Sequence, residues 1–91
     1  MSVTVRVPVS IGYLTRNNKV IKCEASSITE CIDNLDLMFA GLKDKLCDNE
    51  GEPLDNFNVY VNGENIRYLQ GKVTPLKDGD EVAIIPAAAA G

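Results

Sequence analysis

One stretch of the chain, residues 26–39 (SSITECIDNLDLMF), has the spacing of an amphipathic helix and lies between two groups of strand-like segments. Ser27 followed by Glu30 is the pattern of a capping box, which satisfies free amides at a helix N-terminus. Gly41 is typical of the residue that ends a helix. The apolar residues recur at helical spacing, which predicts one buried face made of Ile28, Cys31, Ile32, Leu35 and Phe39. A single helix must bury such a face, and a sheet built from the flanking strands can cover it.

The residues before the helix alternate with the period of two that is typical of β-strands. Valine occupies every second position of residues 3–9, which places Val9 on the same side as the earlier valines. Pro8 cannot donate to a sheet ladder and therefore indicates an edge or a strand end. Residues 15–19 (TRNNK) are turn-forming, and residues 19–25 (KVIKCEA) predict a second strand. The two strands form an N-terminal hairpin with a long connector.

After the helix the chain first passes through a short helical turn and then a polar loop. Residues 42–46 (LKDKL) are the turn, and residues 47–56 (CDNEGEPLDN) form an acidic connector expected at the surface. Its carboxylates can be interpreted as a metal site, but nothing in the pattern fixes them in a ligand geometry. We therefore expect a solvated loop and no metal.

The last third of the chain predicts three further strands. Residues 57–61 alternate, and Asn62-Gly63 is the dipeptide required by a type I′ hairpin turn. A short return strand over residues 64–67 follows. Asp78-Gly79 then marks a turn before the final strand, residues 81–85. Asp78 and Asp80 are interpreted as turn and strand-entry residues.

The order strand, strand, helix, then two or three strands predicts an α+β fold of the β-grasp (ubiquitin-like) type. Its mixed sheet has four or five strands, with one main helix packed across it. A right-handed crossover through the helix places the first and last strands side by side and parallel. We expect one domain over residues 1–86 and a flexible C-terminal tail over residues 87–91.

Composition excludes several classes of function. A net charge of −4 and a pI near 4.6 argue against nucleic acid or an anionic membrane as partner, and favour a basic patch on a protein partner. No apolar run approaches the roughly 20 residues of a membrane span. The first residues (MSVTVRVPVS) do not resemble a signal peptide, so a cytoplasmic location is expected.

The residue types needed for catalysis are largely missing. The chain has no histidine, which removes Ser-His and Cys-His nucleophile pairs, and it has no glycine-rich phosphate loop. We therefore expect no enzyme activity and no bound cofactor. The cysteines have no metal-ligand spacing and are expected to be reduced. Cys31, and more weakly Cys23, are interpreted as core residues, whereas Cys47 is left undecided.

Three stretches resemble the ubiquitin-like sulfur-carrier proteins of the MoaD/ThiS family, and the resemblance covers almost the whole chain. They are VNGENIR at 61–67, L-x-DGDEV at 76–82 and IIPAAAAG at 84–91. The family includes the small subunit of molybdopterin synthase, the thiamin sulfur carrier and the carriers of cysteine biosynthesis. The first strand and NIRYLQG (65–71) look most similar to the cysteine-biosynthesis, or CysO-like, carriers.

The resemblance implies a function for the C-terminus. In such carriers an E1-like adenylyltransferase/sulfurtransferase uses ATP to activate the carboxylate of the last glycine, here Gly91, and sulfur then converts it to a thiocarboxylate. By the same analogy a pyridoxal-phosphate (PLP)-dependent synthase accepts the sulfur to make cysteine or homocysteine. A JAMM-type zinc peptidase then frees the product. Molybdopterin or thiamin synthesis is the alternative.

The tail sequence suits a carboxylate that must enter several active sites. Pro86 keeps the chain extended, and four residues after a proline are too few for a stable helix. Little bulk is added by Ala87, Ala88, Ala89 and Ala90. The family ends in Gly-Gly, whereas this sequence ends in Ala90-Gly91. Three explanations stay open: alanine is tolerated, further residues follow in the natural product, or the tail is without function.

A partner surface is expected beside the tail. Tyr60 and Ile85 could form an exposed apolar patch, although Ile85 could equally be the edge of the core. Its rim would contain Arg6, Arg67 and Tyr68. A function of a different class, a ubiquitin-like modifier or interaction module, also stays open. A carrier gives a thiocarboxylate at Gly91, whereas a modifier gives a lysine adduct.

Overall fold

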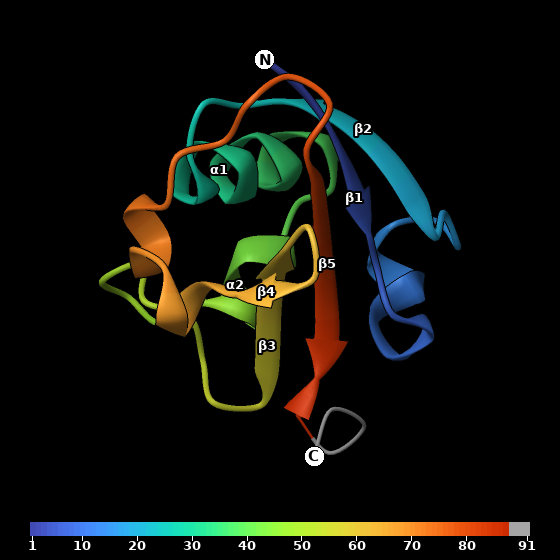
Figure 1. The fold of residues 1–91 in the computed structure, drawn as a ribbon. Coiled ribbons are helices and arrows are strands. Elements are labelled where there is room, and N and C mark those ends of the chain that lie inside the picture. The colour runs from blue at the N-terminus through green and yellow to red at the C-terminus, as the bar shows by residue number, and fades with distance from the viewer. Residues whose placement is uncertain (88–91) are drawn as a thin grey trace.

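The computed structural model, which describes residues 1–87, contains a five-stranded mixed sheet with one main helix across it (Figure 1). The main helix is α1 (Ile28–Met38), and a second short helix, α2 (Leu42–Leu46), follows it. The strands are β1 (Ser2–Arg6), β2 (Val20–Glu24), β3 (Phe57–Val61), β4 (Glu64–Asn65) and β5 (Glu81–Pro86). Three 3₁₀ helices lie in the connections: η1 (Val9–Leu14), η2 (Ile66–Tyr68) and η3 (Gly71–Val73).

The strand order is β2-β1-β5-β3-β4, so the last strand lies in the middle of the sheet. β1 and β5 are parallel, with Val5 opposite Val82, and the other neighbouring strands are antiparallel. The predicted β-grasp fold and the parallel pairing of the first and last strands are therefore confirmed. The sheet has five strands, the larger of the two predicted numbers.

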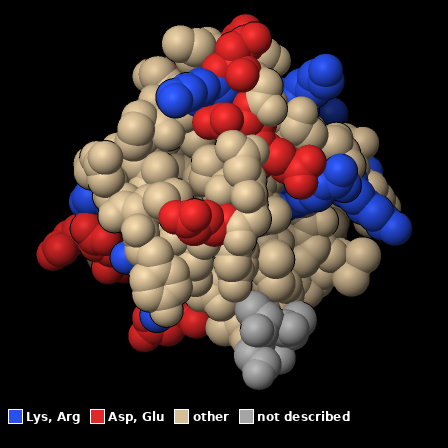
Figure 2. Space-filling model, in the orientation of Figure 1, with Lys and Arg blue, Asp and Glu red and all other residues tan. Residues whose placement is uncertain are grey.

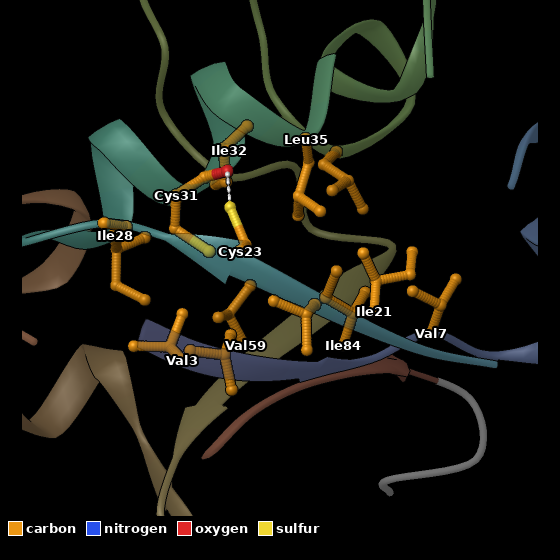
Figure 3. Packing of buried hydrophobic residues seen from close by; sticks show 14 of the residues in the cluster. Val3, Val7, Ile21, Cys23, Ile28, Cys31, Ile32, Leu35, Val59 and Ile84 are labelled. Atoms are coloured by element: carbon orange, nitrogen blue, oxygen red, sulfur yellow. Dashed lines mark hydrogen bonds between the residues drawn. The ribbon is translucent and has the colours of Figure 1, made fainter. Parts of the chain in front are cut away.

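The core fills the space between α1 and one face of the sheet (Figure 3). The helix contributes the predicted stripe of Ile28, Cys31, Ile32 and Leu35, all at most 5% exposed. The strands contribute inward-facing residues at every second position: Val3, Val5, Ile21, Cys23, Val59, Val61, Val82 and Ile84. Phe39 packs against this cluster but is only partly buried. The three cysteines are all free and buried, which places Cys47 in the core as well.

The start of α1 follows the prediction except in one hydrogen bond. The Ser27 hydroxyl oxygen accepts from the Glu30 amide at 3.2 Å, which confirms the N-cap. In a capping box the Glu30 carboxylate would return to the Ser27 amide. Here it accepts from the Ser26 amide at 2.7 Å. The backbone before the helix is paired with a neighbouring segment through the Leu76 amide and the Ser26 carbonyl, and this pairing brings the Ser26 amide to the carboxylate.

Two predicted boundaries were wrong. β1 ends at Arg6, and Pro8 is the N-cap of η1, so Val9 belongs to η1 and not to the alternating strand, and is 76% exposed. α1 ends at Met38, before Gly41. Gly41 does have a positive φ of 95°, but it serves as the N-cap of α2. At Gly41 the chain therefore connects two helices, whereas the sequence predicted that this glycine would end one helix.

The second hairpin has the predicted turn and a shorter return strand than predicted. Asn62 and Gly63 have φ values of 51° and 86°, as a type I′ turn requires. The prediction of a strand to residue 67 was wrong, because β4 ends at Asn65. The Asn65 side chain accepts from the Arg67 amide at 2.9 Å and caps η2, which turns the chain out of the sheet.

The acidic connector is a loop whose backbone is held by hydrogen bonds to one of its own side chains, Asp48. The Asp48 carboxylate accepts from the amides of Glu50 and Glu52 at 2.9 and 3.0 Å. Within residues 1–87 no group of three or more His, Cys, Asp or Glu side chains is arranged to hold a metal ion. No helix in this part of the chain has the length and apolar character needed to cross a membrane.

Candidate partner surface at the end of β5

The C-terminal tail, residues 87–91 and from here called the arm, follows directly on β5, and its first residue is bonded to the segment before β3. Pro86 is opposite Phe57 of β3, and the Ala87 amide donates to the Asn56 carbonyl at 3.0 Å. The backbone entering the arm therefore has a fixed direction, set by the pairing of β5 with β3. The predicted tail residues Ala88, Ala89, Ala90 and Gly91 lie outside the described residues.

Three of the predicted partner residues lie on one face of the sheet, opposite the core. The register puts Arg6 beside Ala83 and Ala83 beside Tyr60, so these side chains form a row across three strands. Ile85 follows on the same face, two residues nearer the arm, because Ile84 between them points into the core and is 4% exposed. The side chains of Tyr60 and Ile85 are partly buried. Ile85 is thus on the outer face and not part of the core.

The charged end of this row is held by an ion pair. Arg6 Nε lies 3.0 Å from Glu81 Oε1, and both side chains are about half exposed (57% and 48%). Exposed pairs of this kind contribute at most about 1 kcal/mol to stability. The effect of the contact is therefore mainly to orient the guanidinium beside Ala83.

The other two predicted residues lie beyond the edge of the sheet. Arg67 is in η2, with its guanidinium nitrogen 3.4 Å from Asp55 Oδ1. It lines a groove of about 160 Å³ together with Phe57 and Asn58 of β3. Tyr68 is 82% exposed and is not part of that groove. The structure therefore brings Arg67 near the beginning of β3, but it does not bring Tyr68 to the row of Arg6 and Tyr60.

The thiols are poorly suited to carry sulfur. Burial, followed by the neighbouring Cys23, raises the pKa of Cys31 to about 12. Burial also raises the pKa of Cys23 and of Cys47. Since the thiolate is the reactive form, these cysteines are inert at neutral pH. They belong to the core, and the chemistry of this chain must use another group.

Sequence reasoning missed two features of this region. Ala83 lies in the middle of the outer row, and the alternation of β5 around Val82 and Ile84 could have placed it there. η1 also lies near the end of β5, where it exposes Val9 and Tyr13 (76% and 65%). No local signal indicates that this connector is helical. The absence of acidic residues before Glu24 could, however, have indicated a basic partner surface there.

Comparisons with known proteins match most or all of this chain. The model of the ThiS family matches residues 5–91. The sulfur carrier protein CysO of Mycobacterium tuberculosis is 32% identical over 93 residues, covering 100% of both chains. A chain in the crystal structure of the Amycolatopsis orientalis BexX/CysO complex is 35% identical, with a TM-score of 0.90 over 98% of this chain and 99% of that one. Small archaeal modifier protein 3 of Haloferax volcanii is 32% identical over 72% of this chain and 71% of its own length.

Proposed function

This chain belongs to the ThiS family, and on that premise we propose that it is a sulfur carrier whose reacting group is the carboxylate of Gly91. The relatives that match over their full length are named sulfur carrier proteins. The chain is accordingly a protein cosubstrate, and the catalytic groups belong to its partners.

The proposed reaction has two steps, the first at the carboxylate oxygen of Gly91 and the second at its carbonyl carbon. A Gly91 carboxylate oxygen attacks the α-phosphate of ATP on an E1-like adenylyltransferase, and pyrophosphate leaves. A sulfide equivalent then attacks the acyl carbon, and AMP leaves with the bridging oxygen. The product is the thiocarboxylate, which later gives its sulfur to an acceptor. ATP is bound by the partner enzyme, and this chain supplies only the acyl group.

The full-length similarity to CysO, up to the final residue, is the observation that carries this proposal. Two features of the structure support it. The arm continues directly from β5, and its first residue, Ala87, is bonded to Asn56 before β3, so the few residues beyond it can be directed into a partner. The buried thiols leave no nucleophilic sulfur on the domain itself.

The favoured acceptor pathway is cysteine or homocysteine synthesis, with a PLP-dependent synthase as acceptor and a JAMM-type zinc peptidase for product release. The similarity to CysO supports this choice over the molybdopterin and thiamin alternatives. Docking of these partners is proposed at the outer row and the groove, through Arg6, Tyr60, Ile85 and Arg67. Tyr68 is proposed only as a peripheral contact, because it lies outside the groove.

The experiment is intact-protein mass spectrometry after incubation with ATP, a sulfide source and the candidate activating enzyme. A mass gain equal to one oxygen-for-sulfur exchange, localised to Gly91 and absent from a Gly91 deletion, is expected. Ala90→Gly is the matched variant, because it restores the Gly-Gly ending of the family. If both chains stay unmodified with an enzyme that modifies a known carrier, the proposal is wrong.

The second candidate function is protein modification, and the similarity to small archaeal modifier protein 3 favours it. In that case the Gly91 acyl group would pass to a lysine amine, and AMP would leave. The same incubation with a lysine-rich acceptor protein distinguishes the two functions. An isopeptide adduct without thiocarboxylate would favour the modifier.

A further inference from the structure

The charges of this chain are unevenly divided between its first hairpin and the remainder. Residues 1–23 contain Arg6, Arg16, Lys19 and Lys22 and no Asp or Glu. The remaining five Lys and Arg and all 13 Asp and Glu follow from Glu24 onward. The hairpin therefore has a formal charge of +4 in a chain whose net charge is −4. Figure 2 shows Lys and Arg side chains on the right, where Figure 1 shows β1 and β2, and others at the top and left.

The fold places the connector of this hairpin at the end of the sheet where the arm leaves. β1 and β5 are parallel, so both strands point toward the same end. The Val7 amide donates to the Lys19 carbonyl at 2.8 Å, which fixes the beginning and the end of the connector there. Figure 1 shows η1, in blue, and the end of β5 at that end of the molecule.

The connector is a built structure with an exposed apolar surface. Ile11 is 4% exposed and Thr15 is fully buried, with its hydroxyl donating to the Asn18 carbonyl at 2.8 Å. These two residues anchor the segment to the domain. Val9 and Tyr13 nevertheless point outward, with 76% and 65% of their surface exposed. The cationic side chains beside them are also free to meet a partner, because the ion pairs found among residues 1–87 involve neither Arg16 nor Lys19.

The arm is too short for a partner to avoid this end of the domain. From Ala87 to Gly91 there are four residues, which span at most about 14 Å when fully extended. An active site that holds the Gly91 carboxylate must therefore lie within that distance of Ala87. The protein surface around such a site must contact the end of the domain.

We propose that Val9, Tyr13, Arg16 and Lys19, here called the basic end surface, dock the activating enzyme beside the channel that receives the arm. The complementary surface on that enzyme is a ring of Asp and Glu side chains around an apolar contact. This inference rests on the sulfur-carrier function proposed above. It replaces, at this end of the molecule, the expectation of a basic partner that the net charge alone suggests.

The test uses ATP–pyrophosphate exchange by the activating enzyme, which reports adenylate formation at Gly91. The variant is Arg16→Glu with Lys19→Glu, and the matched control is Lys45→Glu with Lys77→Glu. Both pairs reverse two exposed cations and change the net charge equally, but the control residues lie in α2 and before β5. We expect the KM for the carrier to rise about tenfold in the first variant with little change in kcat, and less than twofold in the control. A second pair, Val9→Ser with Tyr13→Ser against Leu37→Ser with Val73→Ser, tests the apolar contact in the same way.

The outcomes distinguish failure of the docking surface from failure of the proposed sulfur-carrier function. Exchange with the wild-type carrier but equal KM values for the variant and its control would overturn the docking surface alone. No exchange with the wild-type carrier, from an enzyme that activates a known carrier, would overturn both. A salt series on the wild-type chain does not depend on the folding of any variant. The KM for the carrier should rise between about 50 mM and about 500 mM salt, and a KM independent of salt would contradict an electrostatic contact.

Discussion

Replacement of Leu35 by alanine tests whether α1 stabilises the sheet through one face only. Leu35 lies on the inner face of α1 and is fully buried, whereas Leu37, two residues later on the same helix, is 85% exposed. Truncation of a fully buried leucine leaves a cavity and costs about 3 kcal/mol or more. A domain of 91 residues has a free energy of unfolding of roughly 5–14 kcal/mol, so this loss is a large part of the total. The Tm should fall by roughly 12–24 °C.

The assay is urea denaturation followed by circular dichroism, together with a thermal melt. Leu37→Ala is the matched control, since it removes the same atoms from the same helix and should change the free energy of unfolding by less than about 0.5 kcal/mol. Similar losses for the two variants would refute the one-sided packing of α1. An unchanged m-value in both is needed to assign the change to the folded state.

Three further predictions concern caps, turns and thiols. Ser27→Ala removes the N-cap of α1 and should lower the free energy of unfolding by about 1 kcal/mol, whereas a value near zero in urea denaturation would mean that the cap bond at 3.2 Å contributes nothing. Gly63→Ala should lower the free energy of unfolding by roughly 1–2 kcal/mol because Gly63 has a φ of 86°, although the added methyl group meets no atom within 4 Å. Gly12→Ala is the control and should lower it less, because Gly12 has no positive φ. A larger loss for Gly12→Ala in thermal melts would contradict this prediction. Burial raises the pKa of Cys31 from 9.0 to about 12, so its contribution to stability is complete below about pH 9 and is lost as pH rises toward 12. Urea denaturation across this range should show a steeper fall for the wild type than for Cys31→Ala, and parallel curves would exclude the titration of Cys31 as the cause.

The elements of this fold were predictable wherever one local pattern decided the conformation. The alternation of β3, the Asn62-Gly63 turn and the buried stripe of α1 each follow from spacing and residue type, and the structure contains all three. One boundary failed where a side-chain hydrogen bond ended the strand earlier than the pattern predicts. Asn65 shortens β4 because its side chain caps η2, and the period-two pattern of the sequence gives no sign of that hydrogen bond.

The candidate site was predictable in part for the same reason. Tyr60 and Ile85 could be placed on one face because alternation alone assigns them to the side away from Val59 and Ile84. Arg67 and Tyr68 follow β4, where the chain leaves the sheet, so alternation could not place them. η1 depends on Ile11 and Thr15 finding buried positions against the rest of the domain, which is a tertiary contact without a local signature.

The parallel pairing of β1 and β5 also decides how the domain responds to force. Because the two strands run in the same direction, Met1 and the arm leave the sheet at opposite ends (Figure 1). A pull between an anchored Met1 and a held arm would load the bonds between β1 and β5 in shear, all of them together. β3 grips the other side of β5 through a ladder that reaches Pro86. A pull on the arm is therefore shared by two ladders, one on each side of β5.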